Sequence, residues 1–227
     1  MSLPFRRDAL VRVLPFAAFM VLLTLRGLAP ADGGWGLDGR WLYALQTGLV
    51  AALLIWWWRE YGELVVQTWP PLREFGLAVA LGLLVFVVWI QLDAPWMTID
   101  LGGSAVFVPV DAAGAIDWPL VVVRWLGATL LVPVMEELFW RSFLMRWIQQ
   151  PRFASVAPAQ VGLRAIMLST FLFALAHTLW LAAVLAALAY AWIYVYTGRL
   201  WTAVIAHAVT NGALGIWVLA TGNWHFW

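Results

Sequence analysis

Three short stretches of the sequence place ionisable or amide side chains inside long apolar segments. They are Glu136-Glu137 with Arg141, Phe173 with His177, and His207 with Asn211. A charged side chain at the bilayer centre costs about 2.5–3.5 kcal/mol on insertion scales, so its presence there calls for a function. Carboxylates and imidazoles transfer protons, and imidazole and amide N–H groups stabilise a developing oxyanion. These residue types therefore predict acid–base chemistry inside a membrane.

The two adjacent glutamates are predicted to differ in role. Residues four apart on an α-helix share a face, and Glu before Arg is the favourable order, so Glu137 and Arg141 are expected to pair. The Glu136 side chain points about 100° away and has no charged partner on its own helix. Its carboxylate is therefore free to act as a general base. The Glu137–Arg141 pair could also serve only to stabilise the helix.

His207 and Asn211, also four residues apart, are predicted to present two hydrogen-bond donors on one helix face. Two converging donors suit the oxyanion of a tetrahedral intermediate. The depths from the expected cytoplasmic helix ends are about ten residues for Glu136, thirteen for His177, seven for His207 and eleven for Asn211. At about 1.5 Å per residue, all four fall within one middle layer and could converge. A lone intramembrane His could instead be a hydrogen-bonding group between helices.

Composition predicts the elements that must position these side chains. The chain is 64% hydrophobic and 11% charged, whereas a soluble domain is about 45–50% apolar and about 25% charged. Segments long and apolar enough to span a bilayer lie at about 9–28, 41–58, 76–93, 126–146, 163–179, 181–197 and 200–220. The fifth and sixth share one apolar run, which a tight turn near 177–180 would divide. We therefore expect an all-α fold, a polytopic transmembrane bundle of about seven helices, with 1–227 as a single transmembrane domain.

The distribution of arginine predicts orientation. If the N-terminus is cytoplasmic, most Arg residues lie in inner segments, and only Arg26 and Arg40 lie in outer ones. The 94–117 loop, with a β-like run at 105–110, contains Asp but no Arg and could form an outer cap. This positive-inside pattern predicts that the N-terminus is inside and the C-terminus outside. The expected location is a bacterial inner (plasma) membrane. The first span is expected to be an uncleaved anchor, the alternative being a signal peptide cleaved near 28–31.

In their order, the three motifs resemble the CAAX-protease and bacteriocin-processing family of intramembrane peptidases, also called the Abi or CPBP family. Its pattern is Glu-Glu-x-x-x-Arg, then Phe-x-x-x-His, then His-x-x-x-Asn or Asp. The resemblance covers about 118–215, and three such motifs in order on apolar segments are specific. It implies an endopeptidase whose catalytic core is 118–215. The implied roles are water activation by Glu136 and His177, oxyanion stabilisation by His207 and Asn211, and support of the site by Glu137, Arg141 and Phe173.

The metal question stays open at this level. Zinc is a candidate cofactor, because Glu136, His177 and His207 would supply the three protein ligands of a catalytic zinc site. The family is classified with metallopeptidases, yet a metal-free glutamate mechanism is also argued for it, and we favour no tightly bound metal. The sequence lacks His-Glu-x-x-His and has no Cys, which excludes that zinc signature and thiolate ligands. Arg124 is expected to pair with Asp117 or to extend outward, without a catalytic role.

Two other classes of function remain. A catalytically silent membrane interaction or immunity protein of the same family would be marked by a lost core residue, and none is lost. A proton-coupled transporter would show broken helices and internal symmetry, which the sequence lacks. The expected partners are membrane lipid and a peptide or protein substrate, such as a C-terminal sorting or lipidated segment. No nucleic-acid partner is expected.

Overall fold

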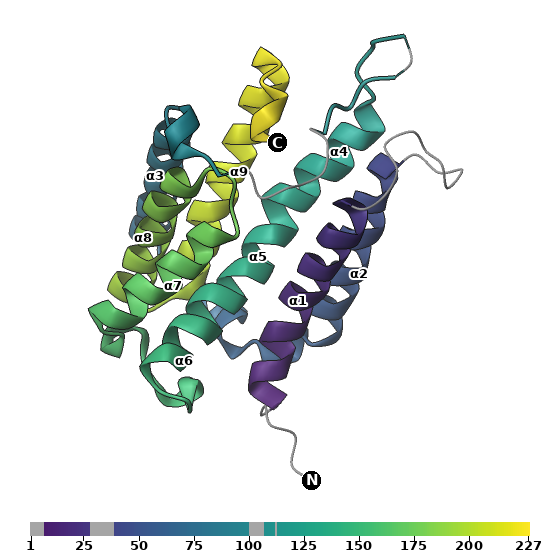
Figure 1. Ribbon diagram of the computed structural model, residues 1–227. Helices are drawn as coiled ribbons and strands as arrows, with labels where there is room; N and C mark the ends of the chain where they lie inside the picture. Colours follow the sequence, from purple (N-terminus) through teal and green to yellow (C-terminus); the bar gives the residue numbers. More distant parts are fainter. Residues whose placement is uncertain (1–6, 28–38, 100–106, 112) are drawn as a thin grey trace.

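The computed structural model describes residues 7–27, 39–99, 107–111 and 113–227, and most of them are helical (Figure 1). Seven apolar helices make up the bundle: α1 (Arg7–Gly27), α2 (Leu42–Trp56), α3 (Leu72–Trp89), a composite helix from Trp118 to Gln149, α7 (Leu163–Leu175), α8 (Trp180–Thr197) and α9 (Leu200–Thr221). The predicted all-α, polytopic bundle of about seven helices is confirmed. Five of the seven are long and apolar enough to cross a membrane, whereas α2 and α7 have only 15 and 13 residues.

Short 3₁₀ turns connect these helices, at Gly39–Trp41, Trp58–Glu60, Gly62–Leu64, Val66–Thr68, Pro95–Met97, Phe153–Ser155, Pro158–Gln160 and Trp224–Phe226. The described residues contain no strand. Val110 and Ile116 form a single isolated antiparallel bridge, so the β-like run expected at 105–110 is not a strand over its described part, 107–110. Residues 105 and 106 and the possible cleavage site near 28–31 lie outside the described residues.

The composite helix alternates between α- and π-helical geometry. It consists of α4 (Trp118–Leu126), a π segment (Gly127–Leu131), α5 (Val132–Glu137), a second π segment (Leu138–Met145) and α6 (Arg146–Gln149). Asp117 caps its start by accepting a hydrogen bond from the Leu120 N–H. This cap explains why the helix begins well before the expected position 126. π-helical insertions in α-helices often occur at functional sites, and here they flank both glutamates.

The turn between α7 and α8 falls where the sequence predicted it. α7 ends at Leu175 and α8 begins at Trp180, so the predicted fifth span, 163–179, is too long. The His177 N–H donates to the Ala174 carbonyl in a tight turn, which ends the helical hydrogen-bond pattern. His177 therefore lies just beyond the helix rather than inside it. At their other ends, α8 and α9 both stop at glycines in the left-handed region, Gly198 at φ 69° and Gly222 at φ 72°.

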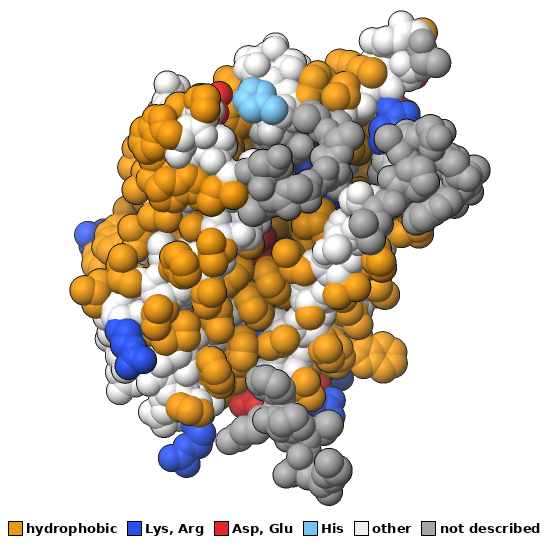
Figure 2. Space-filling view, in the orientation of Figure 1, with side chains coloured by type: hydrophobic (Ala, Val, Ile, Leu, Met, Phe, Trp, Pro, Cys, Tyr) orange, Lys and Arg blue, Asp and Glu red, His pale blue; other side chains and the backbone are white. Residues whose placement is uncertain are grey.

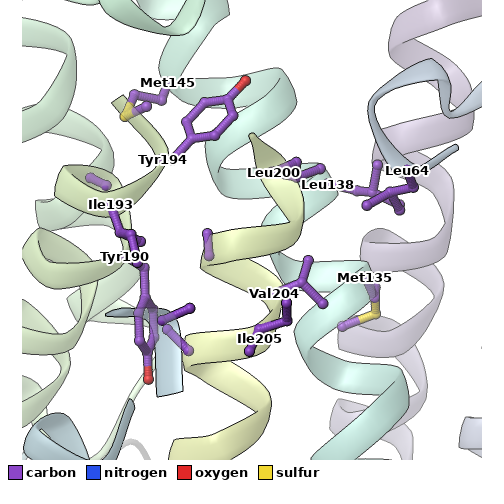
Figure 3. Close-up of a cluster of buried hydrophobic side chains, with 14 of the residues drawn as sticks. Leu64, Met135, Leu138, Met145, Tyr190, Ile193, Tyr194, Leu200, Val204 and Ile205 are labelled. Carbon is purple, nitrogen blue, oxygen red and sulfur yellow. The ribbon is translucent and has the colours of Figure 1, made fainter. Parts of the chain in front are cut away.

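The core surrounds α9, which packs most extensively on α3. Gly82 permits this close approach, because a Cβ atom there would lie 2.4 Å from the Ala206 carbonyl oxygen. Thr210 of α9 lies within hydrogen-bond distance of the Gly82 carbonyl, at 2.9 Å. Figure 3 shows the buried cluster that fills the space between the composite helix, α8 and α9: Leu64, Met135, Leu138, Met145, Tyr190, Ile193, Tyr194, Leu200, Val204 and Ile205.

One buried polar cluster joins α1 to the composite helix. Arg12 donates to both Glu63 carboxylate oxygens, at 3.0 and 2.7 Å, and to the Ser142 hydroxyl, which in turn donates to Glu63. Burial by itself would raise the pKa of the Glu63 carboxyl. The hydrogen bonds and charge of Arg12, together with the Ser142 hydroxyl, outweigh it, so the Glu63 pKa lies below its usual value. The cluster therefore fixes the composite helix relative to α1.

The outer faces of the bundle are apolar. Figure 2 shows hydrophobic side chains over the middle of one face and Arg side chains towards its ends and edges. Large apolar residues remain exposed, including Ile55 at 74%, Leu72 at 85% and Leu163 at 72%. This extent of exposed apolar surface is expected for contact with lipid and not with water.

Candidate active site

A cavity of about 230 Å³ collects the side chains singled out from the sequence. Glu136 from α5, His177 from the α7–α8 turn, and His207 and Asn211 from α9 all line it, together with Phe173. Their predicted convergence is therefore present, although they come from three separate parts of the chain. Most of the remaining lining is apolar, as in ligand sites generally.

Glu137 is the most deeply buried acid of this region, with 0% of its surface exposed. Its Oε1 atom accepts a hydrogen bond from Arg141 Nη1 at 3.2 Å, so the predicted ion pair is present. The same oxygen also lies 2.9 Å from His207 Nδ1, a contact that the sequence did not predict. With the carboxylate oxygen as the acceptor of this contact, Nδ1 of His207 is the donor. The other ring nitrogen, Nε2, is then left for the cavity.

Arg141 connects the composite helix to its neighbours. Its Nη2 donates to the Ala187 carbonyl of α8 at 3.2 Å. Its guanidinium lies over the rings of Phe173 and Tyr190, with centroid distances of 4.8 and 5.4 Å. Arg141 is only 2% exposed. These contacts hold the helix that carries both glutamates against α7 and α8.

His177 is oriented by Phe173, four residues earlier. The two rings stack at 4.3 Å and 21°, and His177 Nδ1 lies 2.8 Å from the Phe173 carbonyl oxygen. A carbonyl only accepts, so Nδ1 is the donor and Nε2 carries the lone pair in the neutral ring. The Phe173 carbonyl lies in the last turn of α7, where it lacks its i+4 partner; it accepts the Ala176 N–H at 3.1 Å and has a second lone pair for the His177 ring. The Phe-x-x-x-His spacing thus places a basic nitrogen at the end of a short helix.

Asn211 is oriented by an irregularity of the composite helix. Its Nδ2 donates to the Ala128 carbonyl at 2.9 Å. In π register the Val132 N–H bonds to the Gly127 carbonyl, and the next residue, Pro133, has no N–H to give. The Ala128 carbonyl therefore lacks a helical partner, and the Asn211 amide fills that place. The second amide hydrogen of Asn211 remains available.

Glu136 differs from its neighbour in having no polar partner. Its Oε2 atom is buried, and within the described part of the chain the side chain has no ion pair and no hydrogen bond. A buried carboxylate without a partner is unfavourable for folding, and such groups concentrate at functional sites. Glu136 therefore has the free carboxylate that the helix geometry predicted.

Sequence reasoning missed several residues of this cavity. Tyr190 stacks on the His207 ring at 4.8 Å and 17°, and its hydroxyl donates to Thr210 at 2.8 Å. Trp89 lies edge-on to His177, with a centroid distance of 6.1 Å. Neither residue carries a charge or a motif that would single it out from the many aromatic residues near span ends. Their roles depend on how the helices are rotated against each other.

Arg124 is the one corrected assignment near the cavity. The predicted pairing with Asp117 is wrong, because the Asp117 side chain caps α4. The outward extension is also wrong, since Arg124 lines the cavity. His225 does not line the cavity, and its Nε2 atom lies 3.5 Å from the Asp93 carboxylate.

The candidate zinc ligands are arranged less favourably than their residue types suggested. Within the described residues, no three His, Cys, Asp or Glu side chains are grouped closely enough to hold a metal. Glu136, His177 and His207 line one cavity without forming such a group. The site therefore does not fit zinc as it stands, and zinc stays an untested prediction.

Comparison with known proteins bears on the segment that carries these residues. Residues 118–213 match the family of Rce1-like type II CAAX prenyl endopeptidases. This match confirms the resemblance drawn from the three motifs, and the matched range contains all seven predicted site residues. It supports a CAAX-type intramembrane protease at the level of the family, and together with the five long apolar helices it indicates an integral membrane protein. No curated protein and no solved structure matches the chain significantly.

Proposed function

We propose that the protein is an intramembrane endopeptidase that hydrolyses a peptide bond close to the membrane. The observation that carries this proposal is the cavity in which Glu136, His177, His207 and Asn211 meet. In three of these side chains, His177, His207 and Asn211, one nitrogen is hydrogen-bonded within the protein. A second polar atom or hydrogen of each is available to a reactant in the cavity. The fourth, Glu136, forms no hydrogen bond or ion pair within the described residues. Side chains oriented in this way can bind water and a peptide carbonyl without changing their own conformations.

The first step is activation of water. Glu136 and the Nε2 lone pair of His177 hold a water molecule, and Glu136 takes its proton as the general base. The water oxygen forms a bond to the carbonyl carbon of the peptide. His177 remains oriented throughout, since its Nδ1–H stays on the Phe173 carbonyl.

The negative charge that develops on the carbonyl oxygen needs hydrogen-bond donors. The second amide hydrogen of Asn211 is one donor, and Nε2–H of His207 is the other. For this step His207 donates from both ring nitrogens, with Nδ1–H on the Glu137 carboxylate and Nε2–H on the oxyanion. When the C–N bond breaks, the proton held by Glu136 passes to the leaving amine, and the products are a carboxylate and an amine.

The family description suggests the class of substrate. We infer a peptide or protein whose C-terminal segment is lipidated or serves in sorting, presented to the cavity from the membrane. The positive-inside pattern supports a bacterial inner-membrane location with the N-terminus in the cytoplasm and the C-terminus outside. A C-terminal reporter fusion found in the cytoplasm would overturn that orientation.

The deciding experiment is cleavage of a peptide library by the detergent-purified protein. Glu136→Ala and His177→Ala should each lower the rate by about 10²–10⁴-fold, the usual contribution of a general base. Glu74→Ala is a matched control, since that carboxylate pairs with Arg199 at 3.0 Å and does not line the cavity. Equal activity in all variants would refute the assignment, and no cleavage by the wild type would favour the catalytically silent alternative.

The same preparation tests the metal requirement. Because the three candidate ligands are not grouped, we expect cleavage to persist after chelation and zinc to be substoichiometric by elemental analysis. Loss of activity on chelation, with recovery on adding zinc, would show that the ligands close around a metal in the working enzyme.

A further inference from the structure

Arg124 lies on the same face of the composite helix as Glu136. Residues 124, 128, 132 and 136 follow one another at intervals of four, and all of them line the cavity. The side chains between the two ends are Ala128 and Val132, which are small and apolar. A shallow apolar strip therefore runs from the free carboxylate to a cation.

Among the residues that the structure describes, no carboxylate pairs with the Arg124 guanidinium. Its Nε atom is buried without a hydrogen-bond partner, and the side chain forms no ion pair with any acid in the described part of the chain. It lies instead over two aromatic rings, 4.6 Å from the Tyr43 centroid and 5.2 Å from that of Phe107. Arg26, whose guanidinium is 5.4 Å from the same Tyr43 ring, differs in donating to the Gln46 side chain at 3.3 Å, so it has a partner within the chain. A charge removed from water is costly unless something pairs with it, so this arrangement favours an anion from outside the chain.

We propose that Arg124 binds the C-terminal carboxylate of the peptide substrate. The inference rests on the proposed peptidase function and names the substrate group that the same cavity recognises. Arg presents a planar pair of N–H donors that matches a carboxylate bidentately. Arg124 lines the same cavity as Glu136, which favours a substrate end over a lipid headgroup.

Helix geometry limits how far the cleaved bond lies from that carboxylate. Twelve residues separate Arg124 from Glu136, a rise of about 18 Å at about 1.5 Å per residue. Both side chains are long and reduce the gap that the substrate must cover. An extended peptide advances about 3.3 Å per residue, so about three to five residues fit between the reacting carbonyl and the terminus. Cleavage should therefore occur at a fixed number of residues from the C-terminus.

The test compares peptides that end in a free carboxylate with the same peptides ending in an amide. For the wild type we expect kcat/KM to favour the acid by about tenfold or more, equivalent to about 1.4 kcal/mol, mostly through KM. In Arg124→Gln the acid-to-amide ratio should fall towards one, and Arg124→Lys should give an intermediate ratio. Arg26→Gln is the matched control, since Arg26 shares the Tyr43 ring but does not line the cavity.

An unchanged ratio in Arg124→Gln, or an equal drop in Arg26→Gln, would overturn the assignment while leaving the peptidase function intact. Cleavage of neither peptide by the wild type would refute the function itself. A second measurement needs no variant, because adding residues to the C-terminus of a substrate should move the cleaved bond by the same number of residues. A cut that stays in place would contradict the proposal. An Arg124 effect that follows added phosphatidylglycerol, and not the peptide terminus, would assign the cation to a lipid headgroup instead.

Discussion

Glu136 and Glu137 are adjacent in the chain but have opposite electrostatic surroundings, so replacing each with glutamine should separate stability from activity. Glutamine keeps the size and shape of the side chain and removes its charge. In Glu137→Gln, Arg141 and His207 both lose the buried oxygen anion on which they converge. In Glu136→Gln, no ion pair or hydrogen bond within the described residues is lost.

The magnitude of the difference follows from those contacts. Removing one partner of a buried ion pair costs about 3–5 kcal/mol, because the other charge is left unpaired. A chain of this size loses about 2–4 °C of Tm per kcal/mol, so Glu137→Gln should lower the Tm by about 6–20 °C. Glu136→Gln removes a buried, unpartnered charge, and its Tm should be unchanged or slightly higher.

Thermal unfolding in detergent, followed by the fluorescence of the 18 Trp residues, measures the stability of both variants. Peptide cleavage at a temperature where both remain folded measures activity. Glu136→Gln should lose the chemical step, and Glu137→Gln should lose about 10²–10³-fold as His207 is misoriented. A Tm loss in Glu136→Gln as large as that in Glu137→Gln would refute the division of roles between the two glutamates.

Three further outcomes are expected. Gly82→Ala should lower the Tm and the cleavage rate together, since its Cβ would meet α9 at 2.4 Å and overpacking costs about 1–3 kcal/mol; a variant like the wild type in both would show that α3 is free to shift. Pro133→Ala restores an N–H that can bond to the Ala128 carbonyl, so kcat should fall while the Tm holds or rises, and an unchanged kcat would contradict the orienting role of that carbonyl. Folding lowers the pKa of Glu63, so its carboxylate contributes fully to stability above the usual carboxyl pKa of about 4.3. This contribution to stability is lost as the pH falls through the lower pKa of the folded state. In Glu63→Gln the Tm should therefore depend less on pH below about pH 4.5. An unchanged fall of Tm with acidity would count against the stabilising Arg12–Glu63 pair.

Local spacing was enough to predict part of the site. The Glu137–Arg141 pair is four residues apart on one helix, and this geometry survives in the π segment. The turn near 177–180 was predictable because one apolar run was too long for a single helix. Helical rise suggested that the four candidates could meet, and they do line one cavity, although His177 lies beyond the end of α7.

Contacts that depend on how the helices are rotated against each other could not be predicted from the sequence. The His207–Glu137 bond joins residues 70 positions apart, and nothing in either motif indicates the partner. Arg124 was assigned to nearby Asp117 on distance in the chain, whereas the Leu120 N–H uses that carboxylate. The π segments were also unforeseen, because a single Pro133 in an apolar run gives no sign of where the register changes.

The shortness of α7 has a consequence for the surrounding lipid. Its 13 residues span about 20 Å, whereas the hydrocarbon core of a bilayer is about 30 Å thick. Exposed apolar side chains such as Leu163 and Phe171 cover its outer face. Hydrophobic mismatch of this kind is relieved by local thinning of the bilayer beside the helix. His177 follows the end of this helix directly, so a substrate entering beside α7 would cross a thinner apolar layer to reach His177, and bilayers of shorter acyl chains should suit the protein better.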